Sequence, residues 1–95
     1  MSERTAPALA TIDRLLPTLQ GLPASADRAH LIDEAEALRR AVASFHMEAI
    51  RFRMYSVERL LRQAAGPSAT ALFEELRDQL EHAGFHTRSH AAPEK

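Results

Sequence analysis

Basic side chains recur at every seventh position in the middle of the chain, as Arg39, His46 and Arg53. On one helix they would lie within about 40° of one another, and His46 and Arg53 would fall inside a broad apolar arc. A charged group there must be paired, reach water along its stem, or meet a ligand. The spacing therefore predicts either a column that contacts an anion or another ligand, or arginines that pair with acids on neighbouring helices.

Histidines recur with a spacing of four near the end of the chain, as His82, His86 and His90, and Asp78 extends the series. On an unbroken helix these side chains would share one face, as metal ligands can. Gly84 interrupts the series, so a solvated tail is the alternative to a metal site. The chain has no cysteine, which excludes disulfides, thiolate metal sites and cysteine nucleophiles.

Motifs for catalysis are missing from the sequence, which contains no glycine-rich phosphate loop and no HExxH pair. We therefore expect a protein that is not an enzyme, and the sequence identifies no cofactor. Residues 51–56 interleave arginine with aromatic residues, as some nucleic-acid binders do. The formal net charge of −1 provides no overall basic field, so a nucleic-acid partner is not expected.

No stretch of the sequence is long and apolar enough to span a membrane, and Asp13 and Arg14 interrupt the only apolar run near the N-terminus. These features predict neither a membrane protein nor a signal peptide, and a cytoplasmic location is the expectation. Eleven arginines stand against one lysine, beside eighteen alanines. This bias favours a GC-rich bacterial genome as the source.

The composition predicts an all-α fold, because eighteen alanines and twelve leucines stand against two valines and three isoleucines. Ninety-five residues form one domain. We expect a helical domain over residues 1–86 and a flexible tail over residues 87–95, which show no apolar periodicity.

Three helices are expected in this domain. The first begins at Thr5 and should kink or end near Leu16, because Pro17 removes a backbone hydrogen bond. The second covers residues 25–65, which contain no glycine or proline, and would be roughly 60 Å long. A compact domain of this chain length measures only about 30 Å across, so the central helix would need a partner. The third runs from Ser68 to Gly84.

Two apolar seams follow the central helix, and the second is rotated by roughly 90° from the first. This rotation, with a wide apolar centre, predicts an antiparallel homodimer with a four-helix bundle at each end, in which His46 approaches its own symmetry mate. The alternative is a helix broken near Ser44 that folds back as an ordinary bundle. The first seam is Leu31, Ala35, Leu38, Val42, Phe45, Ala49 and Phe52; the second is Met47, Ile50, Met54, Val57, Leu61 and Ala64; the expected dimer interface is Val42, Phe45, His46, Ala49, Ile50 and Phe52.

Opposite charges are also expected to face each other across the last hairpin. The second half of the central helix is rich in arginine and the third helix in acids, so an antiparallel pairing would bring them together. These observations predict a small, non-catalytic helical interaction or regulatory module that acts as a homodimer. The alternative is a helical protein that binds a small molecule, an anion or a metal, possibly an enzyme subunit, through the polar column of the central helix.

Overall fold

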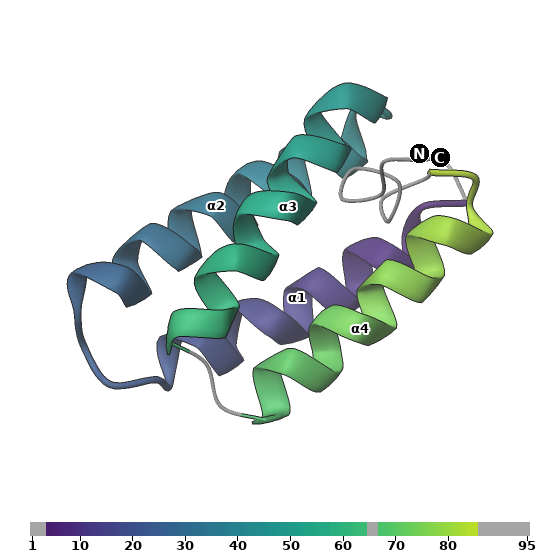
Figure 1. Ribbon diagram of the computed structural model, residues 1–95. Coiled ribbons are helices and arrows are strands. Elements are labelled where there is room, and N and C mark those ends of the chain that lie inside the picture. Colours follow the sequence, from purple (N-terminus) through teal and green to yellow (C-terminus); the bar gives the residue numbers. More distant parts are fainter. Residues whose placement is uncertain (1–3, 65–66, 86–95) are drawn as a thin grey trace, which may run out of the picture.

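The described part of the protein is a bundle of four helices. The computed structural model describes residues 4–64 and 67–85, and it contains α1 (Ala6–Gln20), α2 (Ala26–Ala43), α3 (Met47–Ala64) and α4 (Pro67–His82) (Figure 1). No strand occurs among these residues. The predicted all-α class is confirmed, and the predicted count of three helices is wrong.

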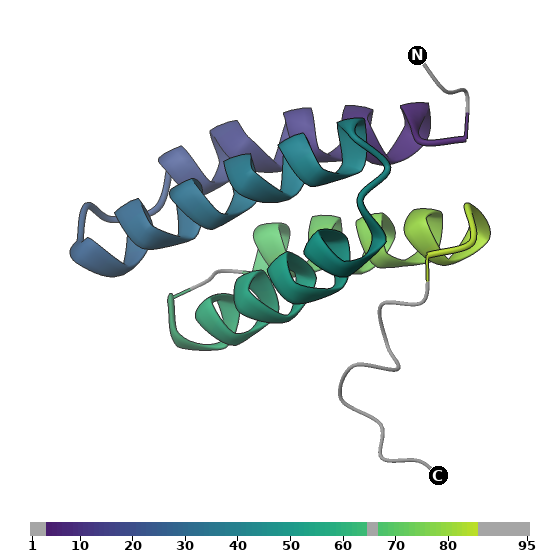
Figure 2. The same cartoon turned by 90° about the horizontal axis from the view of Figure 1, so that it is seen from above.

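The helices form two layers, with α1 and α2 in one layer and α3 and α4 in the other (Figure 2). α1 also packs on α4, and α2 packs on α3, whereas α3 and α4 contact each other much less than these pairs do. The core is mostly aliphatic, with Phe73 and Phe85 as its aromatic members. Its largest fully buried side chains are Ile12, Leu15, Leu19, Leu31, Leu38, Val42, Ile50, Met54, Val57, Phe73, Leu76 and Leu80.

The predicted central helix is broken at residues 44–46. Phe45 has a φ of 58°. The amide of Phe45 donates to the carbonyl of Val42 at 3.2 Å, and the amide of His46 donates to Ala41 at 3.0 Å. This pattern is a Schellman motif, which ends a helix with a left-handed residue that is usually glycine. Because phenylalanine takes that place here, residues 44–46 contain neither glycine nor proline, the residues that usually end a helix.

The end of α4 uses the same motif with glycine in the left-handed place. Gly84 has a φ of 100°, and the amide of Phe85 donates to the carbonyl of Leu80 at 2.9 Å. The rings of Phe45 and Phe85 meet edge to face, with centroids 5.6 Å apart. The guanidinium of Arg4 lies over the Phe45 ring and also donates to the Ala83 carbonyl. These contacts close one end of the bundle.

The remaining helix boundaries follow the local sequence. Ser25 caps α2, since its hydroxyl accepts from the Arg28 amide at 3.0 Å. α1 continues through Pro17 to Gln20, so the helix does not end near Leu16. Pro17 is exposed and lies in the last turn, where its ring removes only the hydrogen bond to the carbonyl of Asp13.

Candidate functional site

Arg39 is held by an acid of the neighbouring helix α1. Its Nε donates to Oδ1 of Asp13 at 2.7 Å, and its Nη2 donates to Oδ2 at 3.1 Å. The hydrogen bond from Arg39 lowers the pKa of Asp13 below its ordinary value of 3.8. This bidentate pair ties α1 to α2.

Arg53 is paired in the same way across α2 and α3. Its Nη1 donates to both carboxylate oxygens of Glu34, at 2.9 and 3.0 Å. Its guanidinium also lies 5.2 Å from the centroid of the Phe52 ring. Both arginines of the predicted column thus have acidic partners on neighbouring helices, and they do not point into one shared site.

His46 and Arg53 nevertheless line one cleft of about 250 Å³ between α2 and α3. Arg40, from the last turn of α2, is the third basic side chain there. The Nδ1 atom of His46 accepts from the Ala49 amide at 3.3 Å, so neutral His46 carries its proton on Nε2. The cleft is lined by Ala37, Arg40, Ala41, Ser44, His46, Ala49 and Arg53, with no carboxylate among them.

The predicted metal series is only partly visible. His82 is exposed, and its Nδ1 lies 3.0 Å from the backbone oxygen of Asp78. His86, His90 and the predicted tail over residues 87–95 lie outside the described residues. Within residues 4–64 and 67–85, no cluster of three or more histidine, aspartate or glutamate side chains could hold a metal ion.

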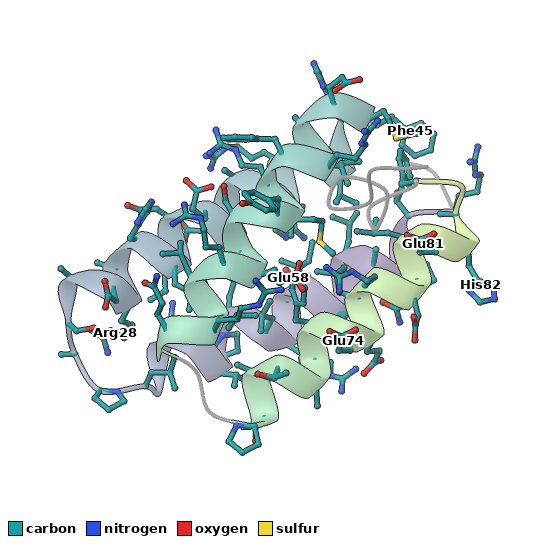
Figure 3. All side chains as sticks on the ribbon, viewed as in Figure 1. Arg28, Phe45, Glu58, Glu74, Glu81 and His82 are labelled. Carbon is teal, nitrogen blue, oxygen red and sulfur yellow. The ribbon has the colours of Figure 1, made fainter. Side chains whose placement is uncertain are left out.

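His82 and Asp78 instead border a groove of about 470 Å³ between the start of α1 and the end of α4 (Figure 3 labels His82). The ring nitrogen of His82 that contacts the Asp78 backbone is already engaged. The groove is lined by Arg4, Pro7, Glu75, Asp78, Gln79, His82 and Ala83.

The residues expected at the dimer interface lie in different places. Val42 and Ile50 are fully buried within the chain, so they face its own core. Phe45, His46 and Phe52 are exposed, and Ala49 is half-buried. The predicted crossing of two long helices needs a continuous helix, which the Schellman motif at Phe45 replaces with a turn.

The outward side of α3 carries a second stripe that the sequence reasoning missed. Its members lie four and three residues apart in alternation, and all of them are exposed. Phe52 is 53% exposed and Tyr55 is 41% exposed. The spacing itself was the signal, since it repeats that of the buried seam on the opposite side. This outer stripe consists of Glu48, Phe52, Tyr55, Arg59 and Arg62.

The expected charge pairing between the last two helices is also different. Arg77 of the acidic helix α4 donates to Glu58 of the basic helix α3, with Nη2 2.8 Å from Oε1. The Arg77 side chain is only 10% exposed, and its guanidinium lies 5.0 Å from the centroid of the Phe73 ring. The pair that joins the two helices therefore consists of the single arginine of the acidic helix α4 and one of the two glutamates of the basic helix α3.

Other charged side chains of α3 and α4 pair with α2 and α1. Arg53 of α3 pairs with α2, and Glu75 of α4 accepts from Arg14 of α1 at 3.1 Å. The predicted register between basic α3 and acidic α4 is therefore not what joins them.

None of the helices in residues 4–64 and 67–85 has the length and apolarity needed to cross a membrane. Comparison of the chain with protein-family models, with curated proteins and with solved structures finds no match in any of the three.

Proposed function

We propose that the chain is a small, non-catalytic helical interaction module whose contact surface includes the outer stripe of α3. The observation that carries this proposal is the exposure of Phe52 and Tyr55, at 53% and 41%, in a chain with only five aromatic residues. Tyrosine, phenylalanine and arginine are the side chains enriched at the centres of protein interfaces. Arg59 and Arg62 extend the same stripe.

The energetics of these rings favour a covering partner. Full burial of an aromatic side chain contributes roughly 1.5–3 kcal/mol, and about half of that remains to be gained by each exposed ring. The guanidinium of Arg53 already covers part of Phe52, which keeps the ring in a defined position. Two ordered aromatic side chains on a rigid helix lose little conformational freedom when a partner binds.

The non-catalytic part of the proposal is supported by how the reactive side chains are used. Arg39 and Arg53 are held by carboxylates, and the His46 Nδ1 caps the start of α3. Each of these groups has a structural role that accounts for its position.

Photo-crosslinking tests this proposal. A benzoylphenylalanine is placed at Tyr55 or at Phe52 of the full chain in living cells, and irradiation should give discrete protein adducts. The same amino acid at Ala29, an exposed position on α2, is the matched control and should give none. Absence of adducts at both α3 positions, or equal adducts at Ala29, would contradict the proposal.

A second candidate function is anion binding in the cleft between α2 and α3. The observation that favours it is the convergence of Arg40, His46 and Arg53 on a cleft without a lining carboxylate. Inorganic phosphate should then raise the melting temperature, because a ligand that binds the folded state stabilises it. The shift should disappear in Arg40→Gln, and an equal shift in wild type and variant would rule this candidate out.

A further inference from the structure

We infer that the partner of the α3–α4 face is a second copy of this chain, with α3 of each copy lying on α4 of the other. This inference rests on the proposed function, since it names what the outer stripe of α3 binds. The twofold axis of the dimer would run parallel to the helices, between the α3–α4 layer of one copy and the α3–α4 layer of the other.

The first argument is the charge of the two helices. α3 carries four arginines and two glutamates, whereas α4 carries four acids and one arginine. The two helices lie side by side in one layer (Figure 2). Arg53 pairs with α2, Glu75 pairs with α1, and Asp78 lines the groove beside α1. The remaining charged side chains still give this layer a basic half on α3 and an acidic half on α4, which is the pattern of a self-complementary surface.

The second argument is that two of the four arginines of α3 have no partner in the described part of the chain, whereas Arg53 and Arg62 are paired. In the described part of the chain, Arg59 has neither a hydrogen bond nor an ion pair, and Arg51 has none either. The Nε of Arg51 is buried without a hydrogen-bond partner. Because this atom is buried within the chain, Arg59, which is exposed, is the arginine that a carboxylate of a second copy can reach.

The third argument is the open seam between α3 and α4. These helices contact each other much less than the other neighbouring pairs, and a hollow of about 130 Å³ separates them near the hairpin turn. Its lining includes Leu61 and Phe73, so apolar atoms border it. Figure 3 labels Glu58, Glu74 and Glu81 along this face.

The outer stripe reaches this seam through a chain of ion pairs. Arg62 of the stripe contacts Glu58 at 3.2 Å, and Glu58 contacts Arg77 of α4 at 2.8 Å. The basic stripe and the acidic helix thus form one continuous surface.

Charge also selects the symmetry axis. Two copies that meet through this face have two choices of twofold axis within the plane of contact. An axis across the helices would lay α3 on α3 and α4 on α4, which opposes like charges. An axis along the helices lays each α3 antiparallel on the α4 of the second copy, which opposes unlike charges.

This second arrangement also fixes the register. Rotation about an axis along the helices keeps the level of each residue, so α3 meets the second copy's α4 at the levels seen within one chain. Arg59 then lies near the level of Glu74 of the second copy. Each contact occurs twice because of the symmetry.

Sedimentation velocity of charge-reversed variants tests this inference. Arg59→Glu and Glu74→Arg should each raise the dimer dissociation constant by about tenfold, because two symmetric contacts change from attraction to repulsion. The double variant Arg59→Glu with Glu74→Arg should restore most of the wild-type affinity. Thermal melts at dilute concentration check that each variant is folded. Glu36→Arg, at an exposed position of α2, is the control.

Three results would overturn the inference: a wild-type chain that stays monomeric at millimolar concentration, a double variant no tighter than the single ones, or an equal loss in Glu36→Arg. The proposed function fails separately. Crosslinks from Tyr55 to a different protein, with a monomeric chain, would leave the interaction module standing and remove the second copy.

Discussion

The two hairpins of this bundle are held together in different ways. α1 and α2 pack closely and are joined by the bidentate pair of Arg39 and Asp13. Their loop is closed by Arg28, which donates to the carbonyls of Gln20 and Leu22 at 3.0 and 3.2 Å.

α3 and α4 contact each other little, and Arg77 and Glu58 form the ion pair between them. The first hairpin is joined by a bidentate ion pair and by arginine contacts to its loop, and its Arg14 and Glu34 also hold the second hairpin. The second hairpin keeps aromatic and charged side chains on its surface. This difference indicates that the first hairpin mainly stabilises the fold and that the surface of the second hairpin is the one suited to bind a partner.

The largest expected effect is on the apolar core, and it should differ between the hairpins. Replacement of the fully buried Leu15 of α1 by alanine (Leu15→Ala) should lower the free energy of unfolding by roughly 4–5 kcal/mol, near the upper end for such truncations. Leu61→Ala, beside the hollow between α3 and α4, should cost only about 2–3 kcal/mol because the site adjoins existing open space. Urea unfolding measures both values, and an equal cost would contradict the contrast in packing.

The ion pair between α3 and α4 gives the next effect. Glu58→Gln should lower stability by about 1–3 kcal/mol, because the largely buried guanidinium of Arg77 loses its closest carboxylate. Arg77→Met should cost less, since it removes the buried charge together with its need for a partner. If Arg77→Met lowers the free energy of unfolding in urea more than Glu58→Gln does, the ion pair contributes more to the stability of the α3–α4 seam than we expect.

Substitutions at the left-handed residues of the two Schellman motifs should change stability by different amounts. Gly84→Ala should destabilise the protein by about 1–2 kcal/mol, because its φ of 100° is unfavourable for alanine. The new Cβ would also lie 3.0 Å from Nη2 of Arg4. Phe45→Gly should be close to neutral, since relief of the left-handed strain offsets loss of the contact with Phe85. Thermal melting measures both, and a stabilised Gly84→Ala would refute the assignment.

The smallest effect concerns pH and the pair of Asp13 and Arg39. The pKa of Asp13 is lower in the folded state than its ordinary value of 3.8, so its contribution is complete above that value. It is lost as the pH falls through the lower, folded pKa. Both side chains are about half exposed, so Asp13→Asn should cost at most about 1 kcal/mol at neutral pH.

The difference between wild type and Asp13→Asn should vanish in acid. Urea unfolding of both proteins over a pH series checks this, and a gap that widens toward low pH would have the wrong sign.

Much of the fold could be predicted from the sequence. The apolar spacing identified the buried positions of both seams that lie in the core, such as Leu38 and Met54. The predicted start of the central helix at residue 25 agrees with Ser25 as the cap of α2. Gly84 was correctly placed at the end of the last helix.

The break at Phe45 was assigned only as an alternative, because a Schellman motif without glycine leaves no mark in residue propensities. The roughly 90° rotation between the two apolar seams was the sequence signal for this break. The rotation arises because α2 and α3 face the core from different directions, whereas we expected one continuous helix with two neighbours.

The candidate site was harder to predict, since charge pairing depends on which helices become neighbours. Arg53 pairs with Glu34 of α2, and the expected topology could not supply this partner because it placed both residues on one continuous helix. Arg39 pairs with Asp13 of α1, which is the pairing with a neighbouring helix that was the alternative to a ligand-binding column. Phe52 was placed at an interface by its periodicity and is exposed, but Tyr55 was not singled out.

The measurement that tests the central claim most directly is a concentration series of amide NMR spectra on the full chain, from micromolar to millimolar. The account predicts that amides around Tyr55 and Arg59 of α3 and around Glu74 of α4 shift as the concentration rises. Amides of α1 and of the exposed side of α2 should stay in place. Shifts confined to α1 and α2, or an absence of shifts along the whole series, would contradict the claim that the α3–α4 face binds a second copy.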